Sequence, residues 1–274
     1  MPTLPSGHTP EPAAESHHAR QVAESFGADA ARYDRARPRY PDAMVAAVVA
    51  RTPGPEVLDV GCGTGIAARQ FQAAGRTVLG VDVDARMAAY ARGAGVDTEV
   101  AAFESWDPGG RAFDAVVAGQ TWHWVDPVAG AAKAARVLRP GGCLALFWNT
   151  FRPAPAVAEA LAAAHRRALP DAPLNPWTPA ALDGSTAVLE RAADGIDRNG
   201  AFGPPTEYRF PWERTYSREE WLDQVRTHGG VGQLPPPLLE RLLAETGAAV
   251  DALGGAVTMP YATVLLTAAR TATP

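Results

Sequence analysis

The chain has 274 residues, of which 47% are hydrophobic and 20% are charged, a composition typical of a globular protein. Its net charge of −5 offers no basic surface for a phosphate backbone, and no apolar run approaches the ~20 residues that cross a membrane. We therefore expect a soluble protein with no nucleic-acid or membrane partner, built as one large domain or as a domain with a substantial insert.

The N-terminal tail and the two cysteines give further information on the location of the protein. The first twenty residues carry Pro, Ser, Glu and His and lack the apolar region of a secretory signal, so residues 1–25 are predicted to be a disordered tail. Cys62 and Cys143 have neither metal-ligand spacing nor a disulfide pattern, which favours no metal site and a reducing, cytoplasmic location. The alanine-rich, proline-punctuated sequence suggests a bacterial source.

Short apolar runs alternate with helical patterns from residue 41 to 149, the order typical of βαβ units around a parallel sheet. Asp42 and Asp84 are expected to start two of the helices, and Asp126 followed by Pro127 a third. Five strands are predicted, over residues 56–60, 77–81, 99–100, 113–117 and 143–148.

Beyond residue 149 the character changes, because prolines punctuate two helical stretches near residues 156–168 and 179–193. Alternating patterns at residues 206–215 and 257–268 then predict two late strands. We therefore predict an α/β fold with a doubly wound, seven-stranded, mostly parallel sheet and an α-helical insert. Its predicted parts are a core, a helical insert or lid, and a C-terminal part that completes the sheet, over residues 26–150, 151–205 and 206–274.

The most informative segment is the turn Asp-Val-Gly-Cys-Gly-Thr-Gly at residues 59–65, which follows the first strand. Glycines at this place let backbone N–H groups approach a ligand at a helix N-terminus. Asp82 lies about 20 residues further on, the separation expected of an acid that binds ribose hydroxyls. A dinucleotide-binding loop would need a third glycine where Ile66 stands, and Asp59 would repel a pyrophosphate but suit a ligand with an ammonium and a sulfonium.

Together with Gly-Val-Asp at residues 80–82 and Leu-Arg-Pro-Gly-Gly at residues 138–142, this turn resembles the class I S-adenosylmethionine-dependent methyltransferases. The resemblance covers residues 26–149 and, loosely, the chain to Arg270. It implies S-adenosylmethionine as the cofactor, with the glycine turn at the methionine moiety, Asp82 at the ribose and Met87 near the adenine. Ala102, in the triplet Ala-Phe-Glu, departs from the family because it cannot donate or accept through its side chain. The implied cofactor-binding residues within this core are Asp59, Gly61, Cys62, Gly63, Gly65, Asp82, Val83, Met87, Ala102, Phe103, Glu104 and Gln120.

The residues before the core, from Phe26 to Pro41, resemble the lead-in of a sub-group that includes enzymes similar to trans-aconitate methyltransferases. This resemblance implies that Tyr33 or Arg37 folds over the cofactor, where a guanidinium would suit its carboxylate. The alternative is a surface arginine and tyrosines that pack in the core.

His123 is the candidate catalytic residue, because it directly follows the fourth strand at the carboxyl edge of the sheet. An unperturbed pKa near 6.5 would suit a general base at neutral pH, but a histidine between Trp122 and Trp124 is also compatible with simple packing. Trp122, Trp124 and Trp148 are candidates to wall an acceptor or to shield the sulfonium by a cation–π contact, and at least one is expected in the core.

We therefore predict an enzyme that transfers a methyl group from S-adenosylmethionine to a small-molecule acceptor, with oxygen, as hydroxyl or carboxylate, favoured. Two other functions remain open. One is a fold-sharing protein that binds the cofactor but performs other chemistry, such as a cyclisation, because fold alone does not fix function. The other is an NAD(P)-binding oxidoreductase, which Ile66 and Asp59 disfavour.

Overall fold

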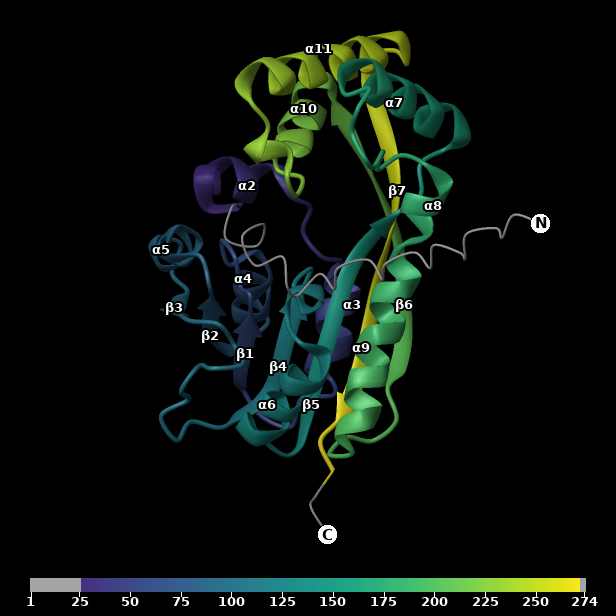
Figure 1. The fold of residues 1–274 in the computed structure, drawn as a ribbon. Coiled ribbons are helices and arrows are strands. Elements are labelled where there is room, and N and C mark those ends of the chain that lie inside the picture. Colours follow the sequence, from purple (N-terminus) through teal and green to yellow (C-terminus); the bar gives the residue numbers. More distant parts are fainter. Residues whose placement is uncertain (1–25, 272–274) are drawn as a thin grey trace, which may run out of the picture.

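Five strands of the central sheet run parallel, and two late strands complete it at one edge (Figure 1). The computed structural model describes residues 26–271, so the tail predicted over residues 1–25 lies outside them. The strand order is β3-β2-β1-β4-β5-β7-β6, and β7 is antiparallel to both of its neighbours. The predicted doubly wound, mostly parallel, seven-stranded sheet is therefore confirmed. The strands are β1 (Glu56–Val60), β2 (Thr77–Asp82), β3 (Asp97–Val100), β4 (Phe113–Gly119), β5 (Leu138–Phe151), β6 (Thr206–Ser217) and β7 (Ala256–Ala269).

Helices cover both faces of this sheet because successive strand residues face opposite sides. In β1, Val57 packs with the helices α3 (Asp42–Val49), α4 (Ile66–Ala73) and α5 (Ala85–Gly93). The next residue, Leu58, belongs to the core on the other face, which includes α6 (Pro127–Val137) and α9 (Ser185–Asn199). A strand buried on both faces gives a nearly continuous apolar run, and β1 follows this pattern except at Glu56 and Asp59.

A third core lies beyond the carboxyl edge of the parallel strands, where β5, β6 and β7 extend further than the sequence pattern predicts. Three helices pack on it and form the upper part of the molecule in Figure 1: α7 (Pro155–Ala168), α10 (Arg218–Arg226) and α11 (Pro236–Ala252). We call this part the cap. The helices of the predicted insert divide between two cores, since α7 joins the cap while α9 packs beside α6 on the sheet. The helix predicted over residues 179–193 is two helices, α8 (Pro179–Asp183) and α9, which meet at Gly184.

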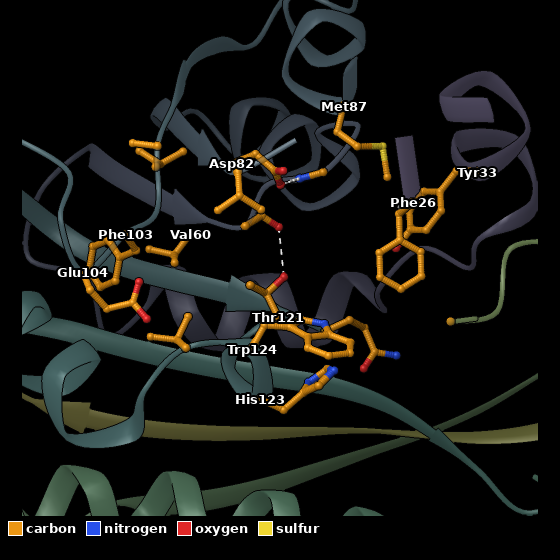
Figure 2. A pocket seen from close by; sticks show the side chains of 18 of the residues that line it. Phe26, Tyr33, Val60, Asp82, Met87, Phe103, Glu104, Thr121, His123 and Trp124 are labelled. Atoms are coloured by element: carbon orange, nitrogen blue, oxygen red, sulfur yellow. Dashed lines mark hydrogen bonds between the residues drawn. The ribbon is translucent and has the colours of Figure 1, made fainter. Parts of the chain in front are cut away.

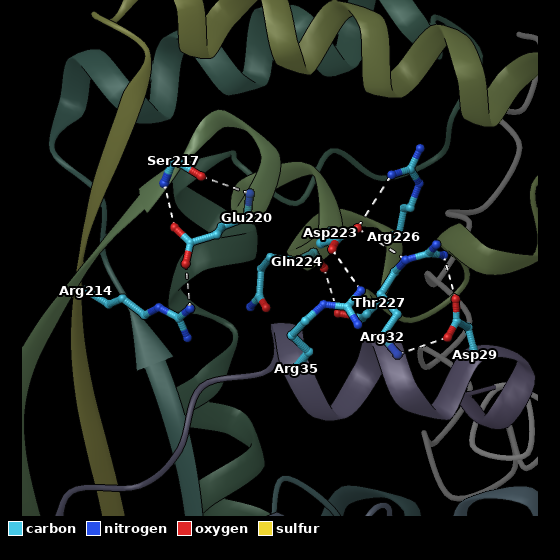
Figure 3. Close-up of polar contacts among 10 residues, drawn as sticks. All are labelled: Asp29, Arg32, Arg35, Arg214, Ser217, Glu220, Asp223, Gln224, Arg226 and Thr227. Atoms are coloured by element: carbon cyan, nitrogen blue, oxygen red, sulfur yellow. Dashed lines mark hydrogen bonds and ion pairs between the residues drawn. The ribbon is translucent and has the colours of Figure 1, made fainter.

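The lead-in forms a short 3-10 turn, η2 (Phe26–Asp29), and the helix α2 (Ala30–Ala36), which lies between α5 and the cap helix α10 (Figure 1). Gly27 donates its N–H to the carboxylate of Asp84, the residue that caps the start of α5, at 2.9 Å. On the side of α2 that faces the cap, Asp223 of α10 forms ion pairs with Arg32 and Arg35 of α2, at 3.2 Å each (Figure 3). The lead-in is thereby held over the carboxyl edge of the sheet by both the core and the cap.

Among the described helices, between residues 26 and 271, none is long and apolar enough to cross a membrane.

Candidate functional site

Two adjoining cavities open at the carboxyl ends of β1, β2 and β4, where open α/β sheets bind their ligands. The larger has a volume of about 300 Å³ and the smaller about 60 Å³. In Figure 2, Phe26 and Tyr33 stand on one side of the larger cavity and Phe103 and Glu104 on the other, with Asp82 above and His123 below. Six residues line both cavities and mark their junction: Tyr33, Arg37, Gly61, Gly63, Gln120 and Thr121.

The glycine turn forms the floor between the cavities, and its backbone requires glycine. Gly61 has φ +62°, and a Cβ there would lie 2.0 Å from the methyl group of Thr121. Thr121 also donates its hydroxyl to the carbonyl of Gly61, at 3.0 Å (Figure 2). Gly63 has φ +55° and donates its N–H to Oδ2 of Asp82, at 2.7 Å. The turn is therefore fixed by a threonine after β4 on one side and by the acid at the end of β2 on the other.

Asp82 is the last residue of β2 and lines the larger cavity. Its Oδ1 accepts the N–H of Asp84 at 2.8 Å, while Oδ2 accepts that of Gly63. Burial raises the pKa of this carboxyl, whereas the two backbone donors favour its ionised form. Each carboxylate oxygen can accept a further hydrogen bond, so Asp82 keeps capacity for two hydroxyl groups of a ligand.

Asp59 lies in β1 and lines the smaller cavity, although only 1% of its surface is exposed. Within the part of the chain that the structure describes, its Oδ2 has no hydrogen-bond partner. Burial, with a smaller contribution from the charge of Asp82, raises the pKa of Asp59 to about 8. A buried, unsatisfied carboxyl group costs free energy unless a partner compensates it, so this atom is a candidate to receive a ligand cation.

Tyr33 lies in α2 and Arg37 directly follows this helix, and both residues line the two cavities. The Arg37 guanidinium carbon lies 5.1 Å from the centroid of the Tyr33 ring, and Nη2 donates to the backbone carbonyl of Thr227 in the cap. Among residues 26–271 the buried Nε of Arg37 has no partner. Among the described residues that line these two cavities, Arg37 is the only arginine. Tyr40 of the same lead-in packs against Phe147 in the core and also lines the smaller cavity.

Phe103 lies on the side of the larger cavity away from Phe26 and Tyr33 in Figure 2, and Val83 and Met87 add further apolar lining. Glu104 also lines it, and its Oε1 accepts the N–H of Asp126 at the start of α6, at 3.1 Å. Ala102 lines neither cavity; the adjacent Ala101 does. An adenine beside these residues would therefore meet mainly apolar side chains and backbone atoms.

Two residues of the predicted loop lie behind the cavity wall. Gly65 lines neither cavity and is the residue before α4, with φ +83°. Cys62 lines the smaller cavity, but burial raises the pKa of its thiol, which leaves the sulfur as a protonated, apolar contact.

His123 lies in the 3-10 turn η3 (Trp122–Trp124) directly after β4, and its ring lines the larger cavity. The indole N–H of Trp148 donates to Nδ1 of His123 at 3.4 Å, and the ring of Trp124 lies 4.7 Å away, centroid to centroid. Burial lowers the pKa of His123 to about 4, with a smaller effect from Arg191. The three candidate tryptophans therefore separate: Trp124 lines the cavity, while Trp122 and Trp148 lie in the core.

Gln120 is the only non-glycine residue with a positive φ, +56°, among residues 26–271. Its N–H donates to the carbonyl of Phe147, and its side-chain Nε2 donates to the carbonyl of Asn149 at 3.2 Å. A left-handed backbone at a non-glycine residue stores strain, and such strain is concentrated at functional sites. This conformation turns the chain so that Gln120 lines both cavities.

Sequence reasoning missed Thr121, Asn149 and Gly229 as cavity-lining residues. Thr121 contacts a glycine 60 positions away, so no local pattern could identify it. Asn149 lies near the carboxyl end of β5, and that position was an available signal. Gly229 belongs to the cap, whose approach to the sheet depends on the tertiary fold. Within residues 26–271 no group of three His, Cys, Asp or Glu side chains is arranged to hold a metal ion.

The family model for the methyltransferase domain matches residues 58–146, which include the glycine turn, Asp82 and His123. Residues 58–146 thus match a methyltransferase domain, over less than half of the chain. The predicted class I methyltransferase family is thereby confirmed for the core, and its members take S-adenosylmethionine as cofactor.

Curated relatives match up to about half of the chain. An uncharacterized methyltransferase of Mycobacterium tuberculosis (strain ATCC 25618 / H37Rv) is 38% identical over 137 residues, 48% of this chain and 54% of the relative. A ubiquinone biosynthesis O-methyltransferase of Thiobacillus denitrificans is 38% identical over 107 residues, 35% of this chain and 44% of the relative. The chain thus spans about half the length of the curated relatives it matches.

Solved structures share the fold over more of the chain. A putative type II methyltransferase from Anaeromyxobacter dehalogenans matches with a TM-score of 0.58 and 22% identity, over 84% of this chain and 97% of that one. The [4+2]-cyclase SpnF matches with a TM-score of 0.53 and 18% identity, over 96% of this chain and 99% of that one. At these identities the likeness concerns the fold alone.

The residues of the methyltransferase domain fit S-adenosylmethionine. The unsatisfied Oδ2 of Asp59 provides an acceptor for its ammonium, and the buried Nε of Arg37 provides a donor for its carboxylate. Asp82 has acceptor capacity for the ribose, and the apolar end near Met87 suits a purine. Apart from Gly65 and Ala102, all residues predicted to bind the cofactor line one of the two cavities, and their individual roles stay predictions.

Proposed function

We propose that the protein transfers a methyl group from S-adenosylmethionine to an oxygen atom of a small-molecule acceptor. The observation that carries the proposal is the buried, unsatisfied carboxyl oxygen of Asp59, which lies at the start of the glycine turn that donates a hydrogen bond to Asp82. A ligand that carries both an ammonium and a ribose would satisfy the two acids together. A pyrophosphate would meet two carboxyl groups, which argues against a nicotinamide dinucleotide.

In this proposal Asp59 and Arg37 hold the two charged ends of the methionine moiety, while Gln120 and the glycine turn flank its chain. Asp82 holds the ribose, and Val83, Met87 and Phe103 surround the adenine. The bound cofactor supplies an electrophilic methyl group on a sulfonium. The contribution of the protein is then to orient the acceptor in line with that methyl group and to exclude water.

The acceptor would lie at the end of the larger cavity that is walled by Phe26, Tyr33, His123 and Trp124. The Phe26 ring lies 5.8 Å from that of Tyr33 and 6.4 Å from that of Trp124, centroid to centroid, so three rings form a continuous wall. The cofactor alone would fill much of a cavity of about 300 Å³, so the aromatic wall, and not the volume, supports a small organic acceptor in this proposal.

An oxygen that arrives ionised suits this site best. With a pKa of about 4, His123 is a weak base at neutral pH and would remove little of a hydroxyl proton. When a carboxylate attacks, the carbon–oxygen bond forms as the carbon–sulfur bond breaks, its electron pair stays on sulfur, and no proton has to leave. The O-methyltransferase name of one curated relative agrees with an oxygen acceptor.

The second candidate is a protein that binds the same cofactor and performs a non-methylating reaction. The observation in its favour is the likeness to the cyclase SpnF over nearly the whole chain. Consumption of S-adenosylmethionine distinguishes the two functions, because methyl transfer converts it stoichiometrically to S-adenosylhomocysteine and a cyclisation does not.

The experiment is an incubation of the purified protein with methyl-labelled S-adenosylmethionine and panels of carboxylic acids, phenols, alcohols and amines. We expect S-adenosylhomocysteine to accumulate with label in a methyl ester or ether. Label transferred to nitrogen or carbon would refute the oxygen acceptor. Conversion of an acceptor without formation of S-adenosylhomocysteine would refute methyl transfer.

A further inference from the structure

Trp148 is buried in the core behind the cavity, yet its polar atom is directed at the catalytic candidate. It lies on β5, with 5% of its surface exposed, and its indole Nε1 is 3.4 Å from Nδ1 of His123. An indole nitrogen is a donor only, so Nδ1 must present its lone pair to Trp148. In a neutral imidazole the proton then resides on Nε2.

The surroundings of the ring favour this neutral form. His123 is enclosed by the Trp124 ring at 4.7 Å and by the core side of β5, and burial lowers its pKa to about 4. The positive charge of Arg191 on α9 also disfavours a second proton on the ring. The other titratable side chains of the cavity face it from other elements: Tyr33, Arg37, Asp82 and Glu104.

We propose that Trp148 is a positioning residue that fixes His123 as the neutral tautomer with its proton on Nε2, so that His123 serves the acceptor as a hydrogen-bond donor and not as a general base. The inference deepens the proposed function and rests on it for the acceptor. It concerns the tautomer of one side chain, however, which is measurable without any acceptor. A donor at this wall would orient an acceptor oxygen beside the methyl group, whereas a base would require the lone pair that Trp148 occupies or the nitrogen that already carries the proton.

The test is nitrogen NMR of the full chain labelled with ¹⁵N-histidine, in which a protonated ring nitrogen and an unprotonated one give separate signals. The chain has six histidines, and the His123→Gln variant assigns the His123 signals by their loss. In the wild-type protein we expect one neutral tautomer, with the proton on Nε2, throughout the range from pH 5.5 to 8. A proton on Nδ1, or titration near pH 6.5, would overturn the proposal.

Trp148→Phe removes the indole donor and keeps an aromatic ring in the core. We expect the Nδ1-protonated tautomer of His123 to become populated in this variant. Trp106→Phe is the matched control, because Trp106 is also buried in the same core and donates its N–H to Glu99 at 2.6 Å instead. Identical tautomer populations in both variants would contradict a role for Trp148, and the wild-type measurement decides the tautomer even where a variant fails to fold.

A titration with S-adenosylhomocysteine separates this inference from the proposed function. We expect both tryptophan variants to bind that molecule with wild-type affinity, because neither side chain lines the cavities. Absence of S-adenosylhomocysteine binding in the wild-type protein would refute the cofactor site and leave the tautomer measurement standing by itself.

Discussion

Binding of S-adenosylhomocysteine at neutral pH should release a proton from Asp59. This carboxyl is buried, has an unsatisfied Oδ2, and has a pKa of about 8 in the absence of ligand. At pH 7 roughly nine in ten molecules would then carry the proton. The ligand ammonium requires the carboxylate, so the proton must leave when the amino acid moiety enters the smaller cavity.

The sign and size of the effect follow from this pKa. Because the free protein binds more protons than the complex below pH 8, affinity should rise with pH, by about nine-fold between pH 6 and pH 7 and about five-fold more between pH 7 and pH 8. The assay is isothermal titration calorimetry in phosphate and in Tris, whose ionisation enthalpies differ. The dependence of the observed enthalpy on the buffer gives the number of protons released, which we expect to be about 0.9 at pH 7.

A matched ligand and a matched variant isolate the interaction. 5′-Methylthioadenosine lacks the ammonium and the carboxylate, so its binding should release no proton and show little pH dependence. Asp59→Asn keeps the volume and removes the titrating group, so the release on binding S-adenosylhomocysteine should disappear. A wild-type affinity that is constant from pH 6 to 8, or an equal proton release with both ligands, would refute the reasoning.

Three further predictions concern the ribose acid, the glycine turn and the lead-in. Asp82→Ala should weaken S-adenosylhomocysteine binding about 100-fold, since two charge-assisted hydrogen bonds of about 1.5 kcal/mol each are lost, and an unchanged dissociation constant would contradict the ribose assignment. Gly61→Ala should lower the free energy of unfolding by about 1–3 kcal/mol more than Gly75→Ala does. Both glycines have a positive φ, but only a Cβ at Gly61 would meet another side chain. Equal losses of unfolding free energy in urea would argue against this packing. Asp223→Asn should accelerate cofactor release about three-fold at low salt, and this acceleration should shrink at high salt. Asp194→Asn is the control, because it removes an exposed ion pair on α9 and should not change the release rate. Equal stopped-flow release rates in the two variants would contradict a role for the ion pairs between α2 and α10.

The same buried carboxyl predicts how stability depends on pH. The unfolded chain loses the Asp59 proton near pH 3.8, while the folded protein retains it to about pH 8. Between these values the folded state binds more protons, so this group stabilises the fold most below pH 3.8 and progressively less as the pH rises to 8. Asp59→Asn should therefore raise the melting temperature of the ligand-free protein at pH 8, and a lower melting temperature would contradict the raised pKa.

Local signals in the sequence were sufficient for the parallel half of the fold. The apolar runs of β1, β2 and β4 are buried on both faces, and Asp84 and Asp126 accept N–H groups at the starts of α5 and α6 as predicted. The glycine turn and Asp82 were also predictable from the sequence. A turn with positive φ requires glycines, and an acid at the end of a strand is recognised from the few residues before it. These features depend on neighbours in sequence or on strand order, which periodicity reveals.

Features that depend on distant parts of the chain were not predictable in the same way. The cap combines α7 with α10 and α11, and residues 169–217 separate α7 from α10, so periodicity alone could not assign the helices of residues 151–205 to their two cores. The lowered pKa of His123 arises from burial, and its Nδ1 partner Trp148 lies 25 positions away on the next strand of the sheet. The sequence predicted His123 as a site residue, but only its tertiary surroundings indicate which ring nitrogen carries the proton.

A crystal structure of the protein with S-adenosylhomocysteine bound is the most direct test of the proposed site. We expect the ligand ammonium within hydrogen-bond distance of Oδ2 of Asp59, and both ribose hydroxyls on the Asp82 carboxylate. A ligand whose amino acid moiety points away from Asp59, or cavities that stay empty at saturating concentration, would contradict the assignment of this pocket to a charged sulfur nucleoside.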